Sequence, residues 1–334
     1  MNPVTHLLAS YTLARAGRAR LASPEMAAFL LAGVSPDVDW LWHLPEPLSP
    51  LRAYGTATHS LAGATVLAAA IGGGVWAASR RRLAARALPR LLAAALVSAW
   101  AHLLLDLCST TGIELYWPLR ATRVSWNIAS GFDAILLAIL ALCALLPALF
   151  GLVTEEISGQ KVPRPARGWP VTALVLTLFY LGARATLDER ATTLLGNAEY
   201  KGKSPMHWAA FASGSSPFTW RGIVETETFL AEVDVPVGTG RGFAAETAAL
   251  KFKPEASPQL DAAAAAPLAR AYTALARFPL MTLESTAEGT RAELGEFGDS
   301  PLRGRRGTWR AVIDLDAQLK VVHQELRYDA LRSP

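Results

Sequence analysis

The chain is poor in cysteine, with only Cys108 and Cys143 among its 334 residues. Both lie in apolar stretches, so neither a disulfide framework nor a cysteine-rich zinc module is expected. Charge is also scarce, because Asp, Glu, Lys and Arg make up 18% of the residues, against about 25% in a typical soluble domain. Apolar residues reach 51% and the mean hydropathy is +0.25. This composition excludes a disordered chain and argues against a single water-soluble globule.

The few charges are unevenly divided along the chain. Residues 1–187 hold 15 basic and 9 acidic side chains, whereas residues 188–334 hold 17 basic and 19 acidic ones. The basic residues of the first part are almost all arginines in short clusters between apolar runs, which is typical of a membrane domain with basic loops. No basic stripe with interleaved aromatic residues is present, so no nucleic-acid partner is expected. We therefore predict a membrane-embedded domain over 1–187 and a soluble domain over 188–334.

Four apolar segments have the length of about 20 residues that a helix needs to cross a bilayer. They cover roughly residues 57–78, 90–108, 131–153 and 169–187. Two shorter segments, Val4–Ala16 and Pro24–Val34, predict a helical hairpin packed against the spanning helices, or a tilted pair. In the soluble part, Trp220–Val235 and Thr308–Arg327 predict strands, and the alanine-rich Pro258–Arg277 predicts a helix. The expected fold is a mainly α polytopic membrane protein with a C-terminal α+β domain.

The arginine clusters predict how the spanning segments are oriented. One cluster follows the first segment at residues 80–90, and another basic loop follows the third at residues 161–167. By the positive-inside rule both loops are cytoplasmic. Arg15, Arg18 and Arg20, at the tip of the N-terminal hairpin, fit the same side. The C-terminal domain, which follows the fourth segment, is then expected to be extracytoplasmic.

Ionisable side chains at the apolar helix ends predict a site, because such groups are costly at membrane depth. His102 and Asp106 are four residues apart, so one helix face presents an imidazole and a carboxylate with the spacing to bind one metal ion. The predicted orientation gathers seven such groups near one leaflet: His6, Asp37, Asp39, His59, His102, Asp106 and Asp133. Structural roles are the alternatives. His6 can pack by a hydrogen bond, His102 and Asp106 can bond to each other, and the other aspartates can cap helices.

These residues stand in motifs that resemble the bacterial inner-membrane YdjM-type family. The motifs are Ser35-Pro36-Asp37-Val38-Asp39, Thr58-His59-Ser60, and His102-Leu103-Leu104-Leu105-Asp106 leading to residues 110–119. Pro217–Gly222 and Arg277–Pro279 in the tail are also similar. The family is described as membrane-bound, metal-dependent hydrolases. The resemblance implies that activity, and it implies a multi-pass protein of the bacterial inner (plasma) membrane.

A more distant similarity links the order of these residues to zinc-dependent phospholipase C and single-strand nucleases. Carried over by position, it implies that Asp37, His59, His102 and Asp106 bind one metal ion. His6 would then bind a second ion that shares Asp106. The further histidine ligands of those enzymes have no match in this chain.

The function expected is a membrane-bound, metal-dependent hydrolase. Mixed imidazole and carboxylate ligands suit Zn²⁺, and Mn²⁺ or Fe²⁺ as well. Asp39, Asp133 or Glu114 would orient ligands or act as general base, with Asp39 ranked first. The position near a headgroup layer, together with the distant similarity, indicates a phosphoester in a lipid or lipid-linked substrate at the outer face.

Two alternatives belong to other functional classes. The same residues would serve a non-enzymatic metal-binding protein or an ion transporter, although a transporter should place polar groups along a path through the membrane. The chain would otherwise be a structural or partner-binding membrane protein that acts through its C-terminal domain. The sequence does not predict an oligomeric state.

Overall fold

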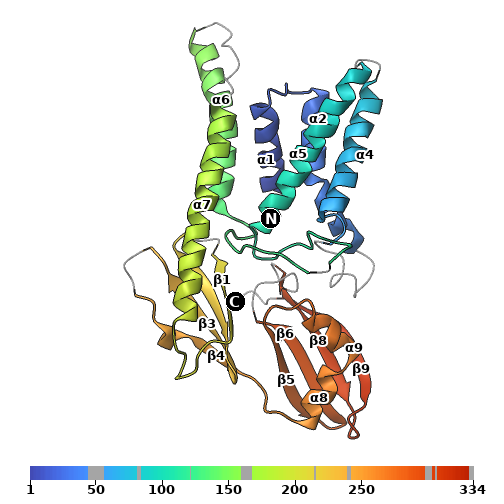
Figure 1. Cartoon of the computed structure of the whole chain (residues 1–334), viewed down its shortest axis with the longest axis vertical. Helices are drawn as coiled ribbons and strands as arrows, with labels where there is room; N and C mark the ends of the chain where they lie inside the picture. Colours follow the sequence, from blue (N-terminus) through green and yellow to red (C-terminus); the bar gives the residue numbers. More distant parts are fainter. Residues whose placement is uncertain are drawn as a thin grey trace. The chain divides into compact units, whose positions relative to one another are not determined.

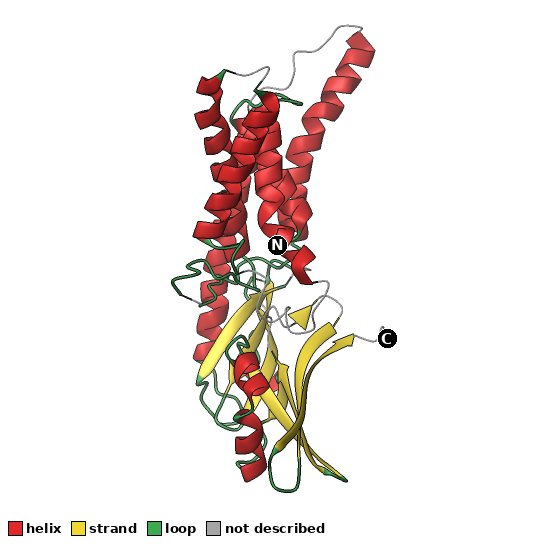
Figure 2. Ribbon diagram, turned by 90° about the vertical axis from the view of Figure 1, so that its right-hand side faces the viewer, coloured by secondary structure: helices red, strands yellow, loops and turns green. Residues whose placement is uncertain are grey.

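The computed structural model describes residues 1–43, 56–80, 84–120, 122–158, 168–213, 216–238, 242–297, 303–304 and 307–330. The chain folds into two compact units. The first holds the described residues of Met1–Trp42 and Gly55–Thr186, and the second holds His43 and the described residues from Leu187 on. Figures 1 and 2 show that the first unit is helical and that the second is built mainly of strands.

The N-terminal hairpin consists of α1 (Pro3–Ala16) and α2 (Pro24–Val34), followed by the 3-10 helix η1 (Ser35–His43). Each α-helix begins with a proline after a capping side chain, and these caps are Asn2 and Ser23. With lengths of about 21 and 16 Å, the two helices are too short to cross a bilayer. They pack against each other and against α5, as the sequence predicts for a hairpin.

The four predicted spanning segments are helices in the structure. They are α4 (Leu61–Ser79), α5 (Leu88–Leu107), α6 (Ala134–Ser158) and α7 (Gly168–Gly196), with the short 3-10 helix η2 (Ala85–Ala87) before α5. All four are long and apolar enough to cross a membrane. Helix α7 continues past the predicted end at residue 187, because the polar residues there are still compatible with a helix. It ends at Gly196, a residue that commonly terminates helices.

Small residues allow α1, α2 and α5 to approach closely. A Cβ atom on Gly33 of α2 would lie 1.7 Å from Ser10 Oγ and 2.7 Å from Ser98 Oγ, so only glycine fits there. Ser98 Oγ hydrogen-bonds to Ser10 Oγ at 2.9 Å and to the Phe29 carbonyl oxygen at 2.7 Å. Small residues of this kind are typical of helix contacts in membranes. The contact fixes how the ends of the three helices face one another.

An irregular loop connects α5 to α6 and also supports the start of α4. Trp126 N donates to the Leu107 carbonyl at 2.7 Å, and Ile113 and Val124 exchange two backbone hydrogen bonds. Leu61 N, the first backbone donor of α4, bonds to the Leu115 carbonyl at 3.0 Å. The loop therefore ties the beginning of α4 to the end of α5.

The second unit contains two antiparallel sheets. The first has the order β1-β2-β3-β4, formed by His207–Ala212, Thr219–Glu225, Phe229–Pro236 and Ala249–Phe252. The second has the order β5-β6-β8-β7, with β9 paired to β8; these strands are Pro279–Thr286, Gly289–Glu296, Gly307–Leu315, Arg303–Gly304 and Val321–Ala330 respectively. A 3-10 helix, η3 (Ala245–Thr247), precedes β4. The predicted strand regions correspond to β2–β3 and β8–β9, whereas β1, β4, β5, β6 and β7 were not predicted.

The predicted helix over Pro258–Arg277 is wrong as a single element. The structure has two short helices instead, α8 (Pro258–Ala264) and α9 (Pro267–Thr273). Pro267 has no backbone N–H to continue the first helix and is well suited to begin a second. Both helices pack against β8, where Ala263, Ala269 and Tyr272 join the core of the second sheet.

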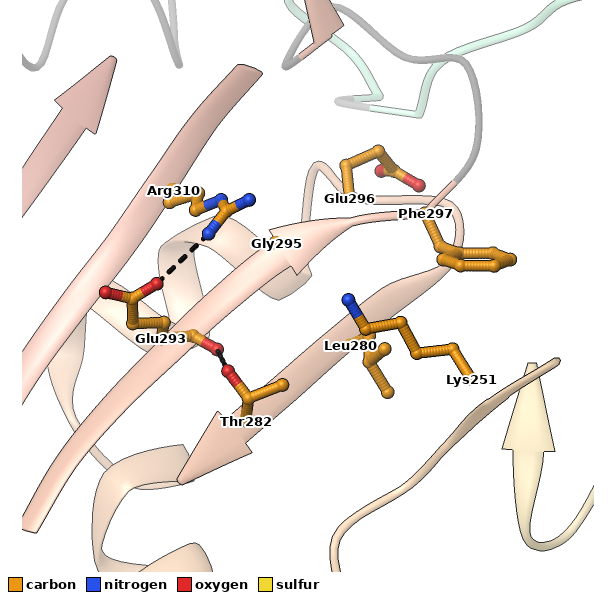
Figure 3. Close-up of a pocket in the computed structure, with 8 residues that line it drawn as sticks. All are labelled: Lys251, Leu280, Thr282, Glu293, Gly295, Glu296, Phe297 and Arg310. Carbon is orange, nitrogen blue, oxygen red and sulfur yellow. Dashed lines mark hydrogen bonds and ion pairs between the residues drawn. The ribbon is translucent and has the colours of Figure 1, made fainter. Parts of the chain in front are cut away.

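A small pocket of about 120 Å³ lies between β4 and the second sheet (Figure 3). Its two glutamates and Arg310 have partners within the domain. Glu293 accepts hydrogen bonds from Arg310 at 3.1 Å and Arg327 at 2.7 Å. Glu296 accepts from the backbone N–H groups of Arg277 and Phe278 at 2.8 and 2.9 Å. The pocket is therefore part of the packing between the sheets.

Candidate metal centre

Five of the predicted site residues, His6, Asp37, His59, His102 and Asp106, lie close together, and we call them the cluster. Helices α1 and α5 carry three of them. His102 and Asp106 lie one turn apart on α5, with His102 Nε2 3.1 Å from Asp106 Oδ2. His6 of α1 places its Nε2 atom 3.2 Å from Asp106 Oδ1. The rings of His6 and His102 stack with centroids 3.6 Å apart. Each of the two carboxylate oxygens of Asp106 thus contacts a different histidine.

Two further side chains come from η1 and from the residue before the Ser60 cap of α4. His59 Nε2 lies 3.3 Å from Asp106 Oδ2 and 3.6 Å from Asp37 Oδ1. Asp37 Oδ1 is also 3.8 Å from His102 Nε2. The ligand atoms of His6, Asp37, His102 and Asp106 all lie within 4.8 Å of one another. The structure therefore brings together all five side chains that were predicted from the sequence as metal ligands.

Hydrogen bonds behind two of the histidines determine which nitrogen faces the cluster. His102 Nδ1 lies 2.8 Å from the Gly33 carbonyl oxygen, and His59 Nδ1 lies 2.9 Å from Asp39 Oδ2. A carbonyl or a carboxylate only accepts hydrogen bonds, so each Nδ1 carries the proton. In the neutral form of each ring, Nε2 then presents a lone pair to the cluster. This is the arrangement by which outer groups orient metal-binding histidines.

The cluster is a convergence of acceptors that fits a cation. His59 Nε2 and His102 Nε2 are only 3.3 Å apart, which is unfavourable for two facing lone pairs unless a positive charge lies between them. Bonds of about 2.0–2.1 Å to one tetrahedral ion place the ligand atoms about 3.3 Å apart, close to the separations described above. The Met1 amino group also contacts Asp106 and brings a positive charge to that carboxylate.

Buried polar atoms without a hydrogen bond also fit a metal site. His6 Nδ1 and Nε2 and Asp37 Oδ2 are buried and make no hydrogen bond within the described part of the chain. Buried polar atoms of this kind usually have a partner in a folded protein. The side chains of His6, His59 and His102 are fully buried, whereas that of Asp37 is 16% exposed. The cluster is therefore closest to the protein surface at Asp37.

The three residues predicted to orient ligands or act as general base lie in different places. Asp39 contacts the nitrogen of His59 that points away from the cluster, so it is placed to orient this histidine. Glu114 lies in the loop after α5, with its Oε1 4.0 Å from Arg123 Nε. Asp133 accepts from Leu136 N at 3.0 Å and from Tyr180 Oη at 2.9 Å. It caps α6 and connects it to α7, the structural alternative considered above.

The sequence reasoning missed Gly33, which supplies the carbonyl that orients His102. A glycine within the apolar stretch Ala28–Val34 gives no signal of its own, because small residues are common in membrane helices. Its role depends on the neighbouring helices, and only the structure shows them.

Comparison with known families agrees with the resemblance in the motifs. The family model described as YdjM inner membrane protein matches residues 1–191, which includes the whole cluster. The tail motifs at 217–222 and 277–279 lie outside this match. None of the curated proteins or solved structures compared with the chain matches it, so the distant similarity to phospholipase C and nucleases is not shown. The match covers more than half of the chain, which therefore belongs to the YdjM family of inner membrane proteins.

Proposed function

We propose that this protein is a membrane-bound, metal-dependent hydrolase with its centre at His6, Asp37, His59, His102 and Asp106. The observation that carries the proposal is the approach of His59 Nε2 and His102 Nε2 at 3.3 Å beside two carboxylates. Three imidazoles and two carboxylates suit Zn²⁺, and also Mn²⁺ or Fe²⁺. Four of the five side chains are buried, and His59 and His102 each have an orienting partner behind the ring, which is typical of metal-binding histidines.

The side chains have distinct roles in the proposed reaction. A bound divalent ion supplies a water molecule of lowered pKa and polarises the ester oxygen. Asp39 keeps His59 oriented, and the Gly33 carbonyl does the same for His102. Asp37 is the most exposed of the five residues, so the substrate approaches from its side. Asp37 Oδ2, which makes no hydrogen bond among the described residues, is placed to accept the proton of the attacking water.

The position of the centre supports a lipid or lipid-linked phosphoester as the substrate. His102 and Asp106 lie in the last turns of α5, and His59 lies just before α4, so the cluster is at the ends of apolar helices that could span a membrane. Helix ends of this kind lie at the depth of the lipid headgroups. The basic loops at the other helix ends support an extracytoplasmic location for the centre and the C-terminal domain.

Metal analysis combined with a hydrolase assay tests this proposal. The purified protein, loaded with Zn²⁺, is incubated with a diester such as bis-p-nitrophenyl phosphate and with phospholipid in mixed micelles. We expect phosphoester cleavage that is lost in His102→Ala, whereas Tyr180→Phe, a change outside the cluster, keeps both the metal and the activity. Bound metal without cleavage of any phosphoester would favour a non-enzymatic metal-binding protein. Full activity in His102→Ala would exclude this centre.

A further inference from the structure

A cavity lies at the end of the helical unit where α1 turns into α2. Its volume is about 810 Å³, and Arg18, Arg20 and Arg90 line it. Arg90 is in the first turn of α5, whereas Asp106 is in the last turn of the same helix. Asp106 follows Arg90 by sixteen positions, which corresponds to about 24 Å along the helix. In Figure 1 the α1–α2 turn likewise lies at the end of the helices away from the N-terminus. The cavity is therefore separate from the candidate metal centre.

The α1–α2 turn holds two of these arginines at the mouth of the cavity. Arg15 Nη1 donates to the Ala19 carbonyl at 3.0 Å and closes the turn from the side of α1. Arg18 adopts a left-handed backbone conformation with φ of 68°, which non-glycine residues other than Asn and Asp rarely adopt. The side chains of Arg18, Arg20 and Arg90 are exposed to solvent. Their guanidinium groups are therefore free to reach a ligand at the mouth.

The lining combines positive charge with an apolar wall. Glu25 is the acidic residue among the lining residues, so three guanidinium groups leave an excess of two positive charges. Ala93 and Val97 of α5 and Phe29 of α2 form the apolar part, and the side chain of Val97 is 50% exposed. Val97 lies within a helix that could span a membrane, so this wall faces the depth of acyl chains. The cavity thus matches a ligand with an anionic head and an apolar tail.

We propose that this cavity binds an anionic phospholipid. Guanidinium groups bind phosphate with parallel hydrogen bonds, and Arg18, Arg20 and Arg90 supply three of them around one space. The acyl chain of the lipid lies along Ala93 and Val97. Basic pockets between membrane helices are known to bind anionic headgroups on the cytoplasmic side, which is the side that the arginine clusters predict for this end of the protein.

The binding test compares two variants that each remove two positive charges from the same end of the protein. Arg18→Asn with Arg90→Gln changes the cavity, and Asn is suited to the left-handed backbone at position 18. Arg80→Gln with Arg86→Gln is the matched control, since these exposed arginines do not line the cavity. Purified full-length protein in a neutral detergent is titrated with phosphatidylglycerol, and bound lipid is counted by native mass spectrometry. We expect about tenfold or greater weakening in the cavity variant and less than twofold in the control. Equal weakening in both variants would show a general effect of surface charge and would overturn the proposal.

A second variant and two further probes separate the lipid from simpler ligands. Ala93→Trp fills the apolar wall without removing a charge, so we expect weaker binding of phosphatidylglycerol even if the arginine variant folds poorly. Phosphatidylcholine, which has a phosphate but no net charge, should bind at least tenfold more weakly than phosphatidylglycerol. Glycerol 3-phosphate should not displace the lipid at equal concentration. Displacement by glycerol 3-phosphate, or unchanged lipid binding in Ala93→Trp, would contradict a site for the whole lipid.

Discussion

His59 Nε2 and His102 Nε2 face each other at 3.3 Å, and the opposite nitrogen of each ring is committed to an acceptor, Asp39 Oδ2 or the Gly33 carbonyl. Neither ring can turn to donate a proton to the other without losing its outer hydrogen bond. The carboxylates of Asp37 and Asp106 face the same point as the two Nε2 atoms. The site therefore concentrates negative charge and lone pairs away from bulk solvent. Burying such groups is strongly unfavourable without compensating positive charge, of which the Met1 amino group at Asp106 supplies one unit.

Loss of a histidine ligand should abolish tight metal binding. We expect His102→Ala to weaken binding of Zn²⁺ by more than about 100-fold, since losing an outer partner alone costs about 10–100-fold. The measurement is the metal content of purified protein after dialysis, determined by mass spectrometry. Asp133→Asn is the control, because Asp133 bonds to Leu136 N and Tyr180 rather than to the cluster. Equal metal content in the wild type and His102→Ala would contradict the assignment.

Asp39→Asn separates an orienting role from that of a general base. If Asp39 acts on His59 through their 2.9 Å contact, its replacement should weaken metal affinity by about 10–100-fold. Activity at saturating metal should then recover to a large extent. A general base would behave in the opposite way, with normal metal affinity and a lasting loss of kcat. Competition with a fluorescent zinc chelator, followed by a rate measurement, distinguishes the two roles.

Gly33→Ala should disturb the cluster through packing alone. The added Cβ would meet Ser10 Oγ at 1.7 Å, and overpacking of this kind typically costs about 1–3 kcal/mol. Displacing α2 also moves the carbonyl that orients His102, so we expect a lower Tm and weaker metal binding together. Gly73→Ala in α4 is the matched control, since a Cβ there meets nothing within 4 Å. A normal Tm and normal metal affinity in Gly33→Ala would contradict the close approach of α1, α2 and α5.

Removal of the metal should destabilise the helical unit. A ligand that binds only the folded state at about 100 times its Kd adds about 2.7 kcal/mol of stability. Chelation should therefore lower the Tm of the wild type, and added Zn²⁺ should restore it. His102→Ala should show little response to either treatment. The measurement is thermal unfolding in detergent with and without a chelator, and an equal response in both proteins would contradict the assigned ligands.

The ion pair across β6 and β8 predicts how the second unit responds to pH. Arg291 donates to both oxygens of Asp314 at 2.7 and 3.1 Å, and this bonding lowers the pKa of Asp314 from its ordinary value of 3.8. A carboxyl group with a lowered pKa stabilises the fold above its unfolded pKa, and the effect is lost as the pH falls through the folded pKa. For this partly exposed pair we expect Asp314→Asn to cost at most about 1 kcal/mol at pH 7. The difference from the wild type should begin to shrink as the pH falls below about 4, and a difference that stays constant as the pH falls further would contradict it.

Local features of the sequence predicted much of the helical unit. The four apolar segments appear as helices α4 to α7. Whether an apolar segment of this length forms a helix depends little on distant residues. The spacing of His102 and Asp106 placed them on one face of a helix for the same reason. Helix geometry alone places two side chains one turn apart next to each other, so their proximity can be predicted without a structure.

Features that depend on contacts between distant elements were not predictable. Asp133 had the same sequence signature as the residues of the cluster, yet it caps α6 and bonds to Tyr180 of α7. The first sheet of the second unit includes β1 and β4, whose short sequences acquire strand structure through pairing with β2 and β3. Periodicity gives no information about which partner a side chain or a strand edge will find.

The five side chains of the centre are spread from position 6 to position 106, on α1, η1, the residue before α4, and α5. Asp106, which the three histidines share, is the last of them to be synthesised. The end of α5 must therefore be synthesised and inserted into the membrane before all five side chains can come together. An ion held by all five side chains of the proposed centre would for this reason bind only after the end of α5 has been synthesised.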